Sequence, residues 1–309
     1  MPALHIPVWP DTILSVTVPP RHPPDAPSAL LVEDQRAELP VHGRVVQGRR
    51  RVRMADVGAD RRARLDSIAR YLHDVAEDDA ADAALPSTIG WVLRRTRMEV
   101  DRFPVLGEDL VLGTYCSATA SRWAERTTVV TGSEGAQVTA VSIWVAVDTK
   151  TGVPARLDER FFSVYGASAD GRHASAKLVL EAPDEPALRI ARPWPLRRSD
   201  VDAWGHVNNA IAWAAVEDAV DIGPSDAAVA LLEHHAPIDP AAEPVLVSER
   251  DGDAWSVWLL EHGKSERVLV ASAIELGPGA ARRQPYGPLA ADGEPTAAGS
   301  GGEPLPAGP

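Results

Sequence analysis

Apolar residues recur at helical spacing at two places in the chain. Leu65, Ile68, Leu72 and Val75 share one face of a helix predicted over residues 60–82, and a shorter helix is predicted over residues 207–220. Each helix is followed by short stretches rich in Val, Thr and aromatic residues, which is typical of an antiparallel meander. These strands are predicted over residues 109–116, 123–132 and 136–147 after the first helix, and over 244–250, 254–263 and 266–276 after the second.

The same unit is used twice. The segment "DVGADRRARLDSIARYLHDVA" begins at Asp56 and "DVDAWGHVNNAIAWAAVEDAV" begins at Asp200, and both open with Asp-Val-x-Ala. Both also place an aspartate eighteen residues later, Asp74 in the first and Asp218 in the second. A strand is expected before each helix, near residues 49–57 and 188–198. The sequence therefore predicts two strand-helix-meander units.

The second unit carries a cluster of polar residues that the first unit lacks. This cluster, "DVDAWGHVNN" at residues 200–209, is called the polar loop below. Where it has Asp202 and His206, the first unit has Gly58 and Arg62. If the repeat carries chemistry, the sequence predicts one site, in the second unit.

Composition divides the chain further. We expect a proline-rich leader at residues 1–44, a first domain at 45–157, a linker at 158–187 and a second domain at 188–276. Residues 277–309 are so rich in Gly, Pro and Ala that a disordered tail is predicted.

Charge and residue usage exclude several classes of function. The net charge of −13 disfavours a nucleic-acid binder, whose affinity comes from neutralising phosphates. No apolar run reaches the roughly 18 residues of a membrane helix, and no signal or transit peptide pattern opens the chain, so a cytoplasmic location is expected. The single cysteine, Cys116, excludes an intramolecular disulfide and is predicted to be an inert strand thiol.

The motif D-x-D-x-x-G-H-V-N-N of the polar loop resembles the signature of hotdog-fold thioesterases, in which an antiparallel sheet wraps a long helix. The first unit, with "VGADRRARLDSIARYLHDVA", "WVLRRTRMEVDRFPVLGEDL" and "VSIWVAVDTKTGVPARL", is similar to the N-terminal half of the acyl-acyl carrier protein thioesterases. The similarity spans about residues 45–275 in the same order. It implies an α+β fold of two tandem hotdog domains, and release of free fatty acids from the carrier protein in fatty acid biosynthesis.

The resemblance implies catalytic roles for Asp202 and His206. Thioester hydrolysis needs an activated water or nucleophile and a site for the negative charge on the carbonyl oxygen, whereas the thiol leaves readily. Gly205 permits a tight approach to the helix start, where backbone N–H groups can stabilise that charge. The expected substrate-binding residues are Trp204, Gly205, Val207, Asn208 and Asn209.

Plain structural roles are the alternatives at these positions. Asp202 could cap the helix or bond its own turn, and an isolated His206 is more often a structural histidine. Asn208 could cap the helix, and Asn209 is expected to be structural rather than catalytic.

The sequence departs from the plant-type pattern at two points. Trp204 stands where that pattern has an asparagine, so it could instead line the acyl tunnel. The acidic residue and the cysteine expected after the second helix fall on Pro237 and Ile238. A nucleophilic cysteine is therefore not supported, and a second carboxylate would have to come from Glu233 or Asp239, with His234 and His235 as nearby alternatives.

The expected partner is an acyl carrier protein, with no cofactor, no metal, no nucleic acid and no membrane span. Such carriers are acidic, so three arginine runs, at residues 49–53, 61–64 and 94–97, are candidate docking surfaces, with a solvated face as the alternative. Two other functions stay open: an acyl-CoA thioesterase, and a catalytically silent acyl-thioester-binding protein. A related dehydration or hydration of an acyl chain fits the motif less well. Monomer and homodimer are both compatible with two tandem hotdogs.

Overall fold

The computed structural model describes residues 40, 42–85, 88–188, 190–261 and 267–278. Most of the predicted leader and tail lie outside these residues. The elements in chain order are β1 (Val46–Arg51), η3 (Met54–Asp56), α1 (Leu65–Asp82), β2 (Ile89–Arg102), β3 (Asp109–Thr119), β4 (Trp123–Gly132), β5 (Gln137–Asp148), α2 (Glu159–Ala169), α3 (Glu185–Leu188), β6 (Arg192–Pro193), η4 (Arg198–Asp200), α4 (Ala210–Ala219), β7 (Asp226–His234), β8 (Pro244–Asp251), β9 (Ala254–Glu261) and β10 (Val268–Pro278).

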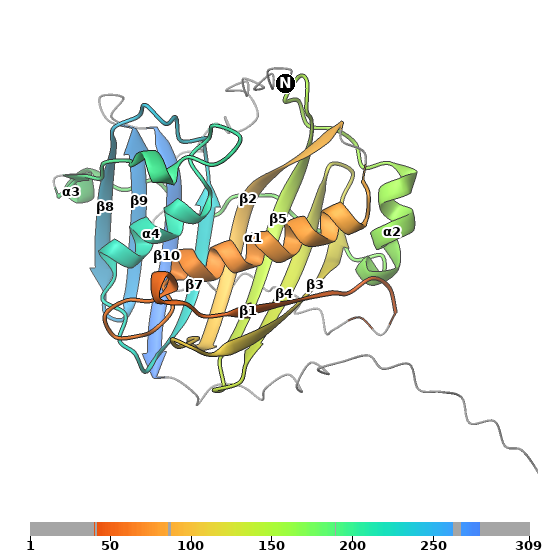
Figure 1. The fold of residues 1–309 in the computed structure, drawn as a ribbon. Helices are drawn as coiled ribbons and strands as arrows, with labels where there is room; N and C mark the ends of the chain where they lie inside the picture. The colour runs from red at the N-terminus through yellow and green to blue at the C-terminus, as the bar shows by residue number, and fades with distance from the viewer. Residues whose placement is uncertain (1–39, 41, 86–87, 189, 262–266, 279–309) are drawn as a thin grey trace, which may run out of the picture.

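All ten of these strands form one sheet, in the order β1-β3-β4-β5-β2-β7-β10-β9-β8-β6 (Figure 1). Every neighbouring pair is antiparallel. Read outward from the central β2–β7 pair, the two halves have the same order of strands. The sheet therefore contains the predicted unit twice, and the halves join where Arg95 to Val100 pair with Glu233 to Ala228.

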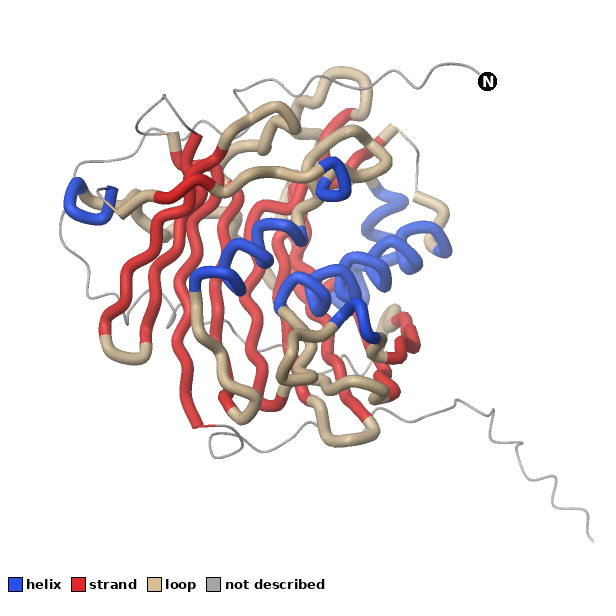
Figure 2. Tube along the Cα trace, turned by 60° about the vertical axis from the view of Figure 1, so that its left-hand side comes forward, coloured by secondary structure: helices blue, strands red, loops and turns tan. Residues whose placement is uncertain are grey.

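Helices α1 and α4 lie on one face of the sheet, as Figures 1 and 2 show. The four residues predicted to form the apolar face of α1, Leu65, Ile68, Leu72 and Val75, are all buried in the main core. Trp213 of α4 is fully buried in the same core. The shared apolar layer under α1 and α4 is the main hydrophobic contribution to folding.

Both helices begin a few residues later than the predicted ranges, which start at residues 60 and 207. Residues 57–63 form a closed loop, with an isolated bridge between Val57 and Ala63 and a left-handed Arg61 at φ 68°. A left-handed residue cannot continue a right-handed helix, so α1 starts at Leu65.

The predicted linker contains helix α2 and then crosses the face of the sheet opposite to α1. Asp158 caps α2 by accepting the Phe161 N–H. Beyond α2, Arg95 of β2 donates to the carbonyls of Ser175 and Lys177. The segment after α2 is thus attached to the outer face of the sheet.

Two strand predictions differ from the structure. The strand expected near residues 188–198 is reduced to the two residues of β6, because Pro193 and Pro195 supply no backbone donor for a longer ladder. At the other end, Gly277 and Pro278, assigned to the tail, extend β10 by pairing with Ala227 and Asp226.

Candidate active site

The polar loop connects η4 to α4 as a short closed turn. Val201 and Val207 form an isolated antiparallel bridge, and the Asp202 N–H donates to the His206 carbonyl at 2.8 Å. Gly205 has φ 80°, in the left-handed region that favours glycine. The predicted need for glycine at this position is thus explained by the turn.

The Asp202 side chain holds this turn together. Its Oδ1 accepts the N–H of Trp204 at 2.8 Å and the N–H of His206 at 3.1 Å. The alternative role, in which the aspartate bonds its own turn, is therefore present in the structure. These bonds use one carboxylate oxygen; within the described residues Oδ2 is not engaged. The turn also fixes where the His206 backbone lies.

The remaining residues of the polar loop divide between helix and core. Asn208 accepts the Ala210 N–H at 2.9 Å through its Oδ1 and so caps α4. Asn209 occupies the N-cap position but makes no side-chain cap hydrogen bond. Val207 is buried in the main core. Asn208 and Val207 thus have clear structural roles at the positions expected to bind substrate.

Trp204 lies at the tip of the turn with 63% of its surface exposed. A residue that lines an interior tunnel would be enclosed by other side chains. The expectation that Trp204 lines the acyl tunnel is therefore not met in this structure, where its side chain is exposed.

The corresponding loop of the first unit has the same backbone hydrogen bonds, displaced by 144 residues, from position 56 to position 200. Gly58 donates to Arg62 as Asp202 donates to His206, and Arg64 donates to Asp56 as Asn208 donates to Asp200. The late aspartates also correspond, because Asp74 accepts from Arg50 of the first unit and Asp218 accepts from Trp194 of the second. The duplication predicted from sequence extends to individual hydrogen bonds.

The side chains differ between the two loops. Arg62 is 5% exposed and forms ion pairs with Asp60 and with Glu217 of α4. Its guanidinium also lies 4.7 Å from the centre of the Phe103 ring. The first loop is therefore closed by a buried arginine, whereas the second has Asp202 and His206 in the same places.

Glu233 does not lie beside the polar loop, which corrects one candidate for a second carboxylate. Its neighbour Leu232 belongs to the core under the helices, so Glu233 points to the opposite face of β7. There its two oxygens accept the N–H groups of Val179 and Leu180 at 2.8 and 3.0 Å. Glu233 thus anchors the segment after α2 to the outer face.

The other candidates near β7 separate in the same way. Asp239 is exposed and accepts the Ala241 N–H within its own turn, so it too is occupied. His235 lies near Glu233, with 3.5 Å between Nε2 and Oε2. His234 alone points into the core below the helices, where its Nε2 is buried and finds no hydrogen-bond partner among the described residues.

The arginine runs are largely engaged within the molecule. Arg62 and Arg94 are buried, and Arg94 donates to the His234 carbonyl. Arg97 pairs with Glu99. The runs at residues 61–64 and 94–97 thus have structural roles, which leaves the exposed side chains of residues 49–53 as the more accessible group.

Cys116 is 2% exposed, and burial raises the pKa of its thiol to about 12. The expected inert thiol agrees with this environment, since the thiolate is the reactive form.

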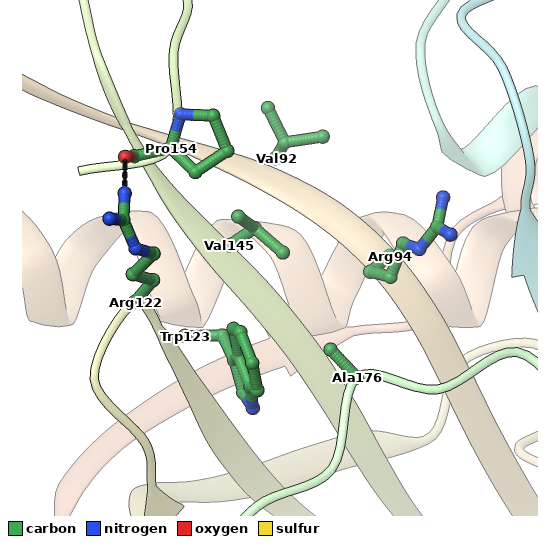
Figure 3. A pocket seen from close by; sticks show the side chains of 7 residues that line it. All are labelled: Val92, Arg94, Arg122, Trp123, Val145, Pro154 and Ala176. Carbon is green, nitrogen blue, oxygen red and sulfur yellow. Dashed lines mark hydrogen bonds between the residues drawn. The ribbon is translucent and has the colours of Figure 1, made fainter. Parts of the chain in front are cut away.

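A small pocket opens on the face of the sheet away from α1 (Figure 3). None of the residues predicted for catalysis or substrate binding lines it. Its lining residues are Val92, Arg94, Arg122, Trp123, Val145, Pro154 and Ala176. In the part of the chain that the structure describes, no group of three or more His, Cys, Asp or Glu residues is arranged to hold a metal ion. No helix there is long and apolar enough to cross a membrane.

Comparison with known proteins agrees with this architecture. A family model described as the acyl-ACP thioesterase N-terminal domain matches residues 43–165. An uncharacterized protein of Mycobacterium tuberculosis (strain ATCC 25618 / H37Rv) is 29% identical over 219 residues, which cover 70% of this chain and 86% of that protein. The chloroplastic palmitoyl-acyl carrier protein thioesterase of Gossypium hirsutum is 26% identical over 183 residues, covering 52% of this chain and 44% of that protein.

Among solved structures, the 12:0-ACP thioesterase from Umbellularia californica aligns with a TM-score of 0.64 at 18% identity, over 77% of this chain and 99% of that one. This likeness confirms the tandem hotdog fold. The chain is thus a thioester hydrolase with two hotdog units in one sheet. It is similar to the acyl-acyl carrier protein thioesterases, whose N-terminal domain model matches residues 43–165.

Proposed function

We propose that the chain hydrolyses acyl-acyl carrier protein thioesters and releases free fatty acids in fatty acid biosynthesis, with the polar loop as its hydrolytic site. One observation carries the proposal. The two units share a loop of the same hydrogen bonding, yet only the second presents Asp202 and His206 where the first is closed by the buried Arg62.

The chemistry assigned to this loop is simple. A water oxygen bonds to the thioester carbonyl carbon while its proton passes to Asp202 or His206. The carbon–sulfur bond then breaks, the electron pair leaves on sulfur, and the proton is returned to the thiolate. Because Oδ1 of Asp202 is committed to the turn, we assign the proton to its Oδ2 or to the imidazole.

The test is release of free thiol from a panel of acyl-carrier-protein and acyl-CoA thioesters. We expect Asp202→Asn and His206→Ala to lower kcat about 100-fold or more, as loss of a general acid or base does. Asp60→Asn is the matched control, because Asp60 bonds the equivalent loop of the first unit and should leave kcat unchanged.

The outcomes separate the remaining alternatives. Faster turnover of carrier-linked than of CoA-linked chains supports the proposal, and the reverse indicates an acyl-CoA thioesterase. Tight binding of acyl thioesters without turnover by the parent protein would indicate a silent acyl-binding protein. Full activity in both variants would remove the polar loop from the mechanism.

A further inference from the structure

The start of α1 is covered by a carboxylate from the other unit. Glu217 of α4 accepts the Leu65 N–H through Oε2 at 2.9 Å, and its Oε1 pairs with Arg62. A helix N-terminus attracts negative charge because its first N–H groups have no partner within the helix. In this half of the molecule the protein's own carboxylate occupies that position.

The repeat identifies the residue that stands in the reciprocal position. With the displacement of 144 residues, Glu217 corresponds to His73, Arg62 to His206 and Leu65 to Asn209. The repeat therefore assigns His73 of α1 to the position that faces the start of α4, beside the polar loop. The Asn209 N–H is not among the hydrogen bonds formed within the described residues, whereas the equivalent Leu65 N–H is bonded to Glu217.

The surroundings of His73 are polar and contain unpartnered groups. Its ring meets Trp144 of β5 edge-on, with 5.8 Å between centroids. His234 of β7 is close enough that the charge of His73 contributes to lowering its pKa to about 3, after burial. His234 is 6% exposed, and its Nε2 has no partner among the described residues; the Trp144 Nε1 is likewise buried and unpartnered. Such groups indicate a place for a polar ligand.

We propose that His73 is a further residue of the active site, presented by the N-terminal unit to the start of α4. A neutral imidazole here, in place of the carboxylate of Glu217, leaves the Asn209 N–H open to the thioester carbonyl oxygen. It also removes the like charge that would oppose the oxyanion. The inference rests on the proposed function, and it adds a contribution from the unit that lacks the polar loop.

Two substitutions test this, with His235→Gln as the control for replacing a histidine, since His235 lies on the outer face. His73→Glu restores the carboxylate of the other half and should lower kcat about 100-fold or more, the effect of losing an oxyanion donor. His73→Gln stays neutral and should lower kcat less, with KM little changed. His235→Gln should match the parent.

A binding measurement keeps this inference distinct from the proposed hydrolysis. Calorimetric titration with fatty acids of 8 to 18 carbons, as carboxylate probes, should show binding to the parent and to His235→Gln but not to His73→Glu. If the parent hydrolyses no thioester, the proposed function fails and this titration alone decides the inference. Absence of binding to the parent would overturn it, and so would equal binding by a folded His73→Glu protein. Should His73→Glu not fold, a His73→Gln protein with parental kcat would overturn it.

Discussion

Two buried histidines, His73 of α1 and His234 of β7, should make the protein sensitive to mild acid. Burial, and then the charge of Arg70, lowers the pKa of His73 to about 4. Burial also lowers the pKa of His234 to about 3. An unfolded histidine has a pKa of about 6.5. Below pH 6.5 these histidines are therefore protonated in the unfolded chain but stay neutral in the folded chain. The free energy of unfolding consequently falls as the pH falls towards the folded pKa values.

The size of the effect follows from these values. Between pH 7.5 and pH 5.0 each histidine should cost about 2 kcal/mol of unfolding free energy, because at pH 5.0 the unfolded imidazole is protonated and the folded one is not. Both together should cost about 4 kcal/mol, a large fraction of the roughly 5–15 kcal/mol that stabilises a typical protein.

Urea denaturation at the two pH values measures this directly. The parent, His73→Gln, His234→Gln and the double variant would each be unfolded at pH 7.5 and 5.0, with His235→Gln as control. Each substitution should shrink the loss on acidification by about 2 kcal/mol, and the double variant by about 4. Comparing each variant with itself at two pH values cancels any change in its basal stability. If the double variant loses as much unfolding free energy between pH 7.5 and pH 5.0 as the parent, the two histidines are not neutral in the folded core, and the reasoning is refuted.

Two further predictions concern residues outside the proposed site. In the Glu233→Gln protein the side chain can accept only one of the two N–H groups of Val179 and Leu180. Trypsin should therefore cleave after Lys177 several-fold faster, while kcat stays near the parental value. Unchanged cleavage would mean that Glu233 does not anchor this segment. Cys116 should react with a disulfide reagent about 100-fold more slowly in the native protein than in urea, because its thiol is buried and its pKa is raised; a fast native reaction would contradict that burial.

The repeated features of the fold could be predicted because each depends on signals close together in sequence. The apolar face of α1 is a four-residue helical pattern, and the meander strands alternate within ten residues or so. Helix α2 is not indicated by an apolar pattern, because its eleven residues mix Phe, Ser, Tyr and Gly. The short β6 was overestimated, since the expectation of symmetry outweighed Pro193.

The role of Glu233 could not be read from sequence, because it depends on the face of β7 to which the side chain points. A shift of one residue would exchange Glu233 with His234 and put the carboxylate under the helices. That register is set by pairing with Arg95 of β2, more than a hundred residues away. The same uncertainty separates His234 from His235, which are adjacent in sequence and lie on opposite faces.

One long-range contact did leave a signal in the repeat. Arg62 and Glu217 lie 155 residues apart and form an ion pair in which the arginine is buried and the glutamate partly buried. When the two units are aligned, the positions of this arginine and this glutamate correspond to His206 and His73. One half thus has an ion pair and the other has two histidines at the corresponding positions. This difference is expected if, after duplication, one copy of the contact was retained for stability and the other copy was free to change. Removing either member of such a pair leaves the other charge without a partner and destabilises the fold. Substitution of Arg62 or Glu217 alone is therefore unfavourable. The corresponding positions of the second unit hold two histidines instead of an ion pair, and the loop of that unit contains Asp202.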